Sequence, residues 1–316
     1  MQLKKYALGV VLGCVASAGA GELEPGLADQ LDQAGPNEIV SALIYLDAQL
    51  DVEALNGEFR RTNATLRTRH VEVIERLQDL ATVTQADVLA ELEDLGRAGG
   101  IEQMQSFWIA NAIRIDATPD VIRDITRHED VFMTYKNYPI ELVSPIDADR
   151  PVEDKDAQDI AQERGGVEPG VAAVRAPEVW NDLGYDGTGI LVASLDTGVD
   201  GNHPALASRW RGLDPAYQNN PEWAFFDPVT NWQFPQDSGS HGTHTMGSIV
   251  GGSPGDGIGV APGAEWIHAA VIDRVSIPQT VADAILAFEW TVDPDGNPNT
   301  IFDVPAVCSN SWGVTT

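Results

Sequence analysis

Two apolar runs that lack polar alternation constrain the fold of this chain more than any other feature of its sequence. They are residues 190–195 (ILVASL) and 266–272 (WIHAAVI). Unbroken apolar runs of this length are expected for parallel strands that are buried on both faces of a sheet. Helices and a further strand are predicted around them, at residues 242–250, 276–290 and 304–310. This alternation of strands and helices predicts an α/β fold with a parallel sheet for residues 171–316.

The preceding part of the chain, residues 37–143, is expected to form a smaller domain of helices and strands. Apolar positions that recur every three or four residues predict a long helix over residues 59–95, with a fresh start near Val83. A Thr-Pro-Asp sequence at residues 118–120 is typical of a helix start, and this second helix should run to about His128. The expected strands are residues 37–47, 106–115 and 131–141. The order strand, helix, strand, helix, strand indicates a small α+β sandwich.

The segment between these two regions, residues 144–170, is rich in Asp, Glu and Pro and has little apolar periodicity. Because such a segment buries little apolar surface, it is expected to be an exposed acidic linker. The whole chain carries 48 Asp and Glu against 19 Lys and Arg, which gives a formal net charge of −29. This balance argues against nucleic acids and anionic membrane surfaces as partners, because proteins bind both through Lys and Arg.

Residues 1–20 have the composition of a secretory signal peptide, with two Lys, then an apolar run, then small residues. Cleavage after Ala18 or after Ala20 fits this pattern. The sequence VLGC that ends at Cys14 also resembles a bacterial lipoprotein box, although Leu12 matches that box poorly. We therefore expect a secreted bacterial protein, with lipid anchoring at Cys14 as the weaker alternative. No apolar run approaches the ~20 residues that span a bilayer, so no permanent membrane span is expected.

Three short segments carry the residues of a candidate catalytic site. They are SLDTGVD around Asp196, SHGTH around His241 and SNSWG at residues 309–313. Asp196 directly follows a predicted buried strand, and α/β folds place functional sites at the carboxyl ends of their strands. An Asp beside a His is the orienting acid and the base of acyl-transfer catalysis. The carboxylate fixes the imidazole tautomer through one ring nitrogen, which leaves the other nitrogen free to take a proton from a nucleophile.

Other interpretations of these segments explain less of the sequence. Asp-Thr-Gly after an apolar run also occurs in aspartic proteases, but the single copy here would require a homodimer and leaves His241 without a role. His241 and His244 are separated by Gly-Thr, whereas the helical zinc motif has a longer spacing and an intervening Glu. Cys308 lies in an apolar strand and is interpreted as a small core residue rather than a catalytic thiol. Two ordinary structural histidines would explain either His alone, but not both segments in this order.

The segments LVASLDTGVDGNHPAL, SHGTHTMGSIVG, GIGVAPGAEW and CSNSWG together resemble the subtilisin-like serine proteases, most closely the bacillopeptidase F type. The segment SFWIANAI within residues 37–143 resembles the inhibitory, I9-like propeptide of that family. The resemblance covers most of residues 37–316 apart from the linker. It implies a parallel-sheet catalytic domain at residues 171–316, preceded by a small α+β propeptide domain. It also implies that protein or peptide substrates are the partners, and that the propeptide acts as an intramolecular inhibitor.

The resemblance further implies roles for single residues. Asp196 would be the triad acid that orients the histidine, and His241 would be the general base. His244 would be structural within its helix. The strand that pairs with the main chain of the substrate would comprise Ser311, Trp312 and Gly313.

The sequence departs from this family at the nucleophile. The Gly-Thr-Ser-x-Ala segment of the catalytic serine is missing, and so is the Ala-Gly-Asn segment of the oxyanion hole. The sequence stops at Thr316, directly after a predicted buried strand, which leaves the expected sheet incomplete with an unpaired edge. We therefore expect a C-terminally truncated endopeptidase precursor that is inactive as written, because the covalent route needs the serine. The alternative is a non-catalytic protein, either a pseudoprotease or a propeptide-type protease inhibitor.

The resemblance also bears on calcium, although no cofactor is certain from the sequence. Members of the family often bind Ca²⁺ through an Asp soon after the His-Pro that follows the catalytic Asp. Here His203-Pro204 is followed by Ala205, and the later Gly-rich loop at residues 251–256 carries one acid. The usual calcium position therefore departs from the pattern of the family. Ca²⁺ remains possible through other acids, and it needs roughly six to eight converging oxygen ligands.

Overall fold

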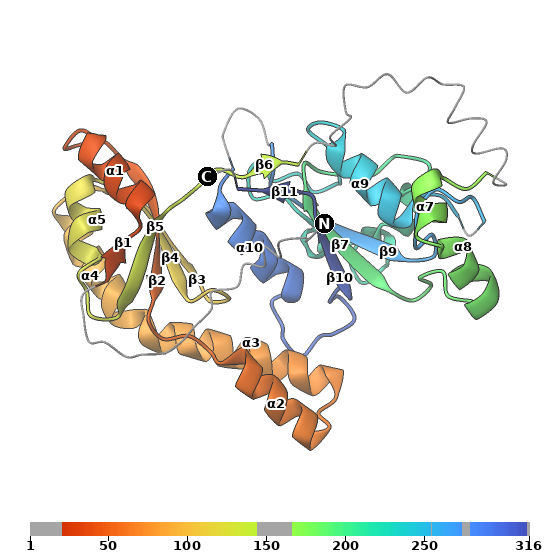
Figure 1. The fold of residues 1–316 in the computed structure, drawn as a ribbon, viewed down its shortest axis with the longest axis horizontal. Coiled ribbons are helices and arrows are strands. Elements are labelled where there is room, and N and C mark those ends of the chain that lie inside the picture. The colour runs from red at the N-terminus through yellow and green to blue at the C-terminus, as the bar shows by residue number, and fades with distance from the viewer. Residues whose placement is uncertain (1–20, 144–165, 254, 274–278, 315–316) are drawn as a thin grey trace.

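The computed structural model describes residues 21–143, 166–253, 255–273 and 279–314. Figure 1 shows two bodies, each of which is built around its own sheet. The predicted signal peptide and most of the predicted acidic linker, residues 1–20 and 144–165, lie outside the described residues. Within the described part of the chain, no helix is long and apolar enough to cross a membrane.

The first body contains a five-stranded sheet in the order β1-β5-β2-β4-β3. β1 is parallel to β5, and the other neighbouring strands are antiparallel. Helices α1, α4 and α5 cover one face, where Leu27, Val88 and Ile122 join Ile44 of the sheet in one core. The strands are β1 (Glu22–Leu23), β2 (Val40–Leu46), β3 (Ile101–Phe107), β4 (Ala112–Ala117) and β5 (Val131–Lys136). The helices are α1 (Pro25–Gln33), α2 (Val52–Thr62), α3 (Leu66–Thr84), α4 (Ala86–Arg97) and α5 (Pro119–Ile125).

Strand β2 has an almost unbroken apolar sequence because both of its faces are covered. Ile44 belongs to the core beneath the helices of the first body. Leu43 points to the opposite face, where it packs with Phe107 and with Ala282 and Ile285 of helix α10 (Val281–Val292). The sheet of the first body therefore packs directly against a helix of the second body.

Two predictions for the first body are wrong in detail. The strand predicted at residues 106–115 is the hairpin of β3 and β4, with a turn at residues 108–111. This turn contains neither Gly nor Pro, and apolar residues continue through it, so the sequence pattern conceals it. The helix predicted over residues 59–95 is divided into α2, α3 and α4. Asn63 ends α2 with a left-handed φ of 50°, and the side chain of Thr65 then caps α3.

The second body contains a four-stranded parallel sheet in the order β10-β7-β9-β8, which confirms the predicted α/β fold. Every residue of β7 is buried, as its apolar sequence predicts. The strands are β7 (Leu191–Asp196), β8 (Phe225–Phe226), β9 (Glu265–Ala270) and β10 (Val307–Asn310). The α-helices are α7 (Pro169–Ala173), α8 (Ala176–Glu178), α9 (His241–Val250) and α10. A π-helical turn, η1 (Val179–Leu183), and three 3₁₀ turns, η2 (Ala207–Arg209), η3 (Arg211–Leu213) and η4 (Pro221–Trp223), complete the body.

The two bodies also meet through hydrogen bonds, some between main-chain groups and some from main-chain N–H groups to a carboxylate side chain. β6 (Glu141–Leu142) pairs antiparallel with β11 (Trp312–Gly313) near α10 (Figure 1). Glu289 of α10 accepts hydrogen bonds from the N–H groups of Trp108 and Ile109 in the hairpin turn. Burial at this junction raises the pKa of Glu289 to about 7, although these two donors act in the opposite direction.

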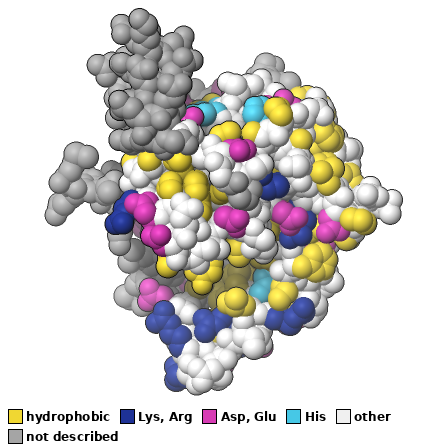
Figure 2. All heavy atoms as spheres, turned by 90° about the vertical axis from the view of Figure 1, so that its right-hand side faces the viewer, with side chains coloured by type: hydrophobic (Ala, Val, Ile, Leu, Met, Phe, Trp, Pro, Cys, Tyr) yellow, Lys and Arg dark blue, Asp and Glu magenta, His cyan; other side chains and the backbone are white. Residues whose placement is uncertain are grey.

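The surface of the second body is mixed in character. On the face in Figure 2, Asp and Glu side chains lie among hydrophobic ones, and Lys and Arg gather mainly toward the lower edge, the side on which α2 and α3 of the first body lie in Figure 1. Exposed hydrophobic side chains include Leu183, the last residue of η1, and Tyr185 shortly after it. Exposed apolar residues are common on globular proteins, so these two do not by themselves mark a binding site.

Candidate active site

Asp196 is the last residue of β7, at the carboxyl end of the parallel sheet. Its side chain is 1% exposed, because the sheet and the start of α9 enclose it. His241 is the first residue of α9. Both residues are expected at the site from their sequence motifs, and the fold brings them together from a strand end and a helix start.

The two side chains form a direct hydrogen bond. Nδ1 of His241 lies 2.8 Å from Oδ1 of Asp196. An ionised carboxylate accepts at this distance, so Nδ1 carries the proton and Nε2 is then the basic nitrogen of a neutral ring. Among the described residues, no hydrogen bond reaches Nε2 of His241, and the imidazole side chain is 20% exposed. The ring can therefore accept a proton from a group that approaches from outside.

Two further donors hold the carboxylate of Asp196 in this orientation. The main-chain N–H of Thr197 donates to Oδ1 at 2.7 Å, and the hydroxyl of Thr245 donates to Oδ2 at 3.2 Å. Thr245 lies on α9, one turn after His241. Both oxygens of the carboxylate are thus engaged, which fixes the plane of the group relative to the imidazole.

Asp237 is a residue of this site that the sequence analysis missed. Its Oδ1 accepts from Thr197 Oγ1 at 2.7 Å and from the N–H of Gly239 at 3.0 Å. Its Oδ2 accepts from the N–H and hydroxyl of Thr243, at 2.9 and 2.5 Å. Burial alone would raise the pKa of Asp237, but the hydrogen bonds from Thr243 and Thr197 lower it below its ordinary value. Asp237 therefore joins the loop after Asp196 to the first turn of the helix that carries His241.

The only sequence signal for Asp237 was an acidic residue shortly before a helix start, where a carboxylate can accept main-chain N–H groups. Two glycines permit the close approach of the same segments. A Cβ on Gly242 would lie 2.0 Å from the carbonyl oxygen of Gly198. Gly198 itself has a φ of 121°, which side chains rarely allow.

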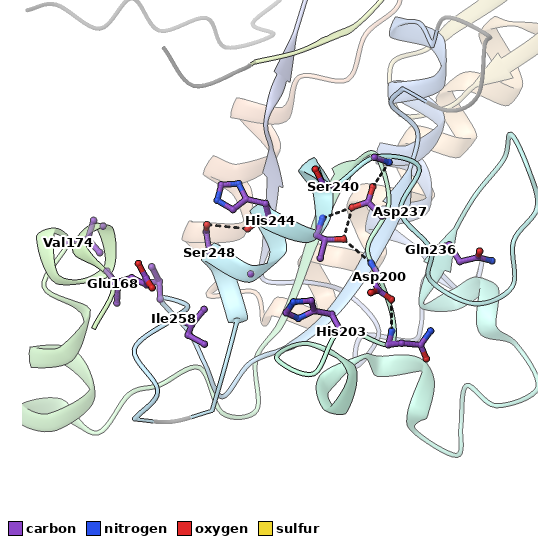
Figure 3. Close-up of a pocket in the computed structure, with 17 residues that line it drawn as sticks. Glu168, Val174, Asp200, His203, Gln236, Asp237, Ser240, His244, Ser248 and Ile258 are labelled. Carbon is purple, nitrogen blue, oxygen red and sulfur yellow. Dashed lines mark hydrogen bonds between the residues drawn. The ribbon is translucent and has the colours of Figure 1, made fainter. Parts of the chain in front are cut away.

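A hollow of about 1060 Å³ lies beside the Asp196–His241 pair rather than over it. Figure 3 shows His244, Asp237, Asp200 and His203 around it, and neither Asp196 nor His241 lines it. His244 was expected to be structural within its helix. The structure places it on the exposed face of α9, where its side chain lines this hollow.

The expected substrate-binding residues lie in the strand that joins the two bodies. Trp312 and Gly313 pair with Leu142 and Glu141, and the N–H of Val143 donates to the carbonyl oxygen of Ser311 at 3.0 Å. Residues 141–143 of the same chain thus occupy main-chain hydrogen-bonding groups of residues 311–313 by extended pairing.

The structure also describes Cys308 and the acidic and histidine side chains that could bind a metal ion. Cys308 packs partly buried against the core, and burial raises the pKa of its thiol to about 11. A thiol that stays protonated at neutral pH is a poor nucleophile. In the described part of the chain, no three His, Cys, Asp or Glu side chains gather to hold a metal ion.

Comparisons with known proteins assign the second body to a family. Residues 187–316 match the sequence model of the subtilase family, Peptidase S8. The chain is 34% identical over 290 residues to bacillopeptidase F of Bacillus subtilis (strain 168), which covers 89% of this chain and 19% of that protein. It is 31% identical over 141 residues to subtilisin E of the same organism, which covers 44% of this chain and 32% of that protein. The chain thus spans less than a third of the length of either relative.

Two solved structures align with the chain at low sequence identity and with TM-scores below 0.5. Fervidolysin from Fervidobacterium pennivorans, a keratinolytic enzyme related to subtilisin, gives a TM-score of 0.47 at 18% identity over 95% of this chain and 38% of its own. The epidermin leader peptide processing serine protease of Staphylococcus aureus gives 0.46 at 11% identity over 88% of this chain and 50% of its own. The sequence comparisons are the stronger finding: residues 187–316 of this chain form a domain of the subtilase family.

Proposed function

We propose that this chain belongs to a secreted serine endopeptidase precursor, in which Asp196 orients His241 and His241 is the general base. The observation that carries the proposal is the 2.8 Å hydrogen bond between Nδ1 of His241 and Oδ1 of Asp196. Similarity to subtilases, among them a relative named an intracellular serine protease, supports the reaction class.

In the proposed reaction, a serine hydroxyl approaches Nε2 of His241 and gives up its proton as its oxygen attacks the peptide carbonyl. The buried carboxylate of Asp196 stabilises the imidazolium that forms, because it already accepts the Nδ1 proton. His241 then returns the proton to the leaving amine. The reaction requires a nucleophilic serine at Nε2, and the family's Gly-Thr-Ser-x-Ala segment is not among these 316 residues.

The proposal includes roles for the parts of the chain. Residues 171–316 contribute to the peptidase domain, and residues 37–143 form a propeptide that inhibits it. The pairing of Leu142 with Trp312 supports this inhibition, because it occupies main-chain groups that a substrate strand would need. The packing of Leu43 and Phe107 against α10 supports a stable association of the two parts. Residues 1–20 would direct secretion.

The test starts from the complete reading frame that contains this sequence. The gene is sequenced past the codon for Thr316, and its whole product is expressed and assayed for casein hydrolysis with and without phenylmethylsulfonyl fluoride. We expect a following Gly-Thr-Ser-x-Ala segment and hydrolysis that the reagent abolishes. His241→Ala should remove the activity, whereas His244→Ala, a matched change on the exposed face of the same helix, should leave most of it. A stop codon after Thr316, or equal activity in both variants, contradicts the proposal.

A further inference from the structure

The side chain of Arg209, at the end of η2, inserts between two segments that lie far apart in sequence. Its Nη2 donates a hydrogen bond to the carbonyl oxygen of Ala205 at 2.9 Å. The same nitrogen donates to the carbonyl oxygen of Val250, and Nη1 donates to that of Gly252. Three main-chain oxygens therefore converge on one guanidinium group.

These oxygens lie where a positive charge is favoured. Val250 is the last residue of α9, and the carbonyl groups of a final helical turn have no partners within the helix. They also form the negative end of the helix dipole, which a cation stabilises. Gly252 follows with a φ of 81°, which turns its carbonyl oxygen toward the same guanidinium. Arg209 thus satisfies the end of the helix that begins with His241.

The calcium ion that the family resemblance implies does not fit these residues. Main-chain carbonyl oxygens are suitable ligands for Ca²⁺, but here they surround a group that already carries a positive charge. The position where an acidic ligand would be expected is Ala205. Asp256 is the one acid of the adjoining loop, and its Oδ2 accepts a hydrogen bond from the N–H of Ser253.

The guanidinium remains a cation in this environment. Burial lowers the pKa of Arg209, and the nearby carboxylate of Asp256 acts in the opposite direction. An arginine pKa begins so high that the group stays charged at every pH at which the protein folds. Its charge is therefore permanent, whereas a bound Ca²⁺ can be removed by a chelator.

We infer that Arg209 replaces a bound calcium ion as the internal cation that holds residues 250–252 against Ala205. The charge anchors the C-terminal end of α9, and this part of the fold needs no Ca²⁺ for stability. The inference does not depend on peptidase activity, because it concerns thermal unfolding of the chain as it stands.

The test measures the melting temperature of the full chain in EDTA and in CaCl2, with Ca²⁺ alone as the probe. Arg209→Met keeps much of the apolar stem but removes the charge and the donors, and should lower Tm by about 5–10 °C in both solutions. Arg209→Lys keeps the charge with a different donor geometry. Its Tm should therefore lie between that of the wild type and that of Arg209→Met. Arg175→Met is the matched control, because Arg175 is exposed and, within the described part of the chain, its side chain bonds with the nearby Glu178.

A gain-of-function variant makes the comparison with calcium direct. Ala205→Asp combined with Arg209→Met supplies an acid and frees the carbonyl oxygens. Its Tm should rise by several degrees on addition of CaCl2, whereas the wild-type Tm should change by less than about 1 °C. The inference is overturned if the wild-type protein gains as much from Ca²⁺ as the double variant does. It is also overturned if Arg209→Met unfolds at the same temperature as Arg175→Met.

Discussion

Nδ1 of His241 lies 2.8 Å from Oδ1 of Asp196, although 45 residues separate them in the chain. Strand β7 ends at Asp196, and α9 begins at His241, so the two side chains meet where a strand and a helix approach each other.

The geometry predicts that the neutral ring of His241 carries its proton on Nδ1. Nuclear magnetic resonance of the chain labelled with ¹⁵N at histidine should show this tautomer, with a downfield Nδ1 proton. Asp196→Ala should abolish the downfield signal. A ring protonated on Nε2 in the wild-type chain would contradict the assigned roles.

Asp237 is predicted to be a positioning residue for the same pair. Asp237→Ala would remove the carboxylate that accepts from the hydroxyl of Thr197 and from the N–H groups of Gly239 and Thr243. Unsatisfied donors of this kind cost about 1–3 kcal/mol each, so we expect a loss of about 2–4 kcal/mol in the free energy of unfolding, after partial relief by water. Urea denaturation measures this loss.

A purely structural role for Asp237 would change stability and nothing else. A positioning role predicts that Asp237→Ala also shifts or broadens the Nδ1 proton signal of His241 below the unfolding temperature. Asp200→Asn is the control, because Asp200 lies on an exposed neighbouring loop and its carboxylate accepts from the N–H of Asn202 rather than from any donor of Asp237. An unchanged His241 signal in Asp237→Ala would limit Asp237 to a structural role.

The sequence predicts the parts of this protein that depend on local pattern. β7 and β9 follow from unbroken apolar runs, and the helix at His241 follows from its position after a polar loop. The Asp196 and His241 segments could be singled out because their motifs are short and specific.

Features that depend on partners distant in sequence could not be predicted in this way. The four hydrogen bonds of Asp237 arise only when the loop after Asp196 meets α9. The turn at residues 108–111 is concealed because its apolar side chains lie close to α10 of the other body. Arg209 is a similar case, since its acceptors at residues 250 and 252 lie 41 and 43 positions away.

The junction between the two bodies should depend on pH through Glu289. Burial raises its pKa in the folded chain to about 7, from an ordinary value of 4.5. A carboxyl group whose pKa is raised by folding binds a proton more tightly in the folded state, so stability falls as pH rises from about 4.5 to about 7. Glu289→Gln keeps an oxygen acceptor for Trp108 and Ile109 but carries no charge at any pH.

We therefore expect Glu289→Gln to unfold close to the wild-type temperature at pH 4.5, and to unfold at a higher temperature than the wild type at pH 8. Differential scanning calorimetry across this range measures the difference. The control is Glu75→Gln, because Glu75 is exposed on α3 and should give no pH-dependent difference. A Glu289→Gln protein that is less stable than the wild type at pH 8 would show that the charge strengthens the junction.

Asp303 is predicted to destabilise the second body above its own pKa. Its side chain is 1% exposed, and neither carboxylate oxygen has a hydrogen-bond partner among the described residues. Burial, aided by the negative charge of Asp295, raises its pKa to about 6 from an ordinary value of 3.8. By the same linkage, stability should fall as pH rises from about 4 to about 6 and remain lower above that range.

Asp303→Asn removes the charge in a side chain of nearly equal size. Its Tm should match the wild type near pH 4 and exceed it by a few degrees at pH 8, whereas the exposed control Asp182→Asn should show no such trend. If Asp303→Asn lowers Tm more at pH 8 than near pH 4, a partner stabilises the charged carboxylate and the prediction is wrong.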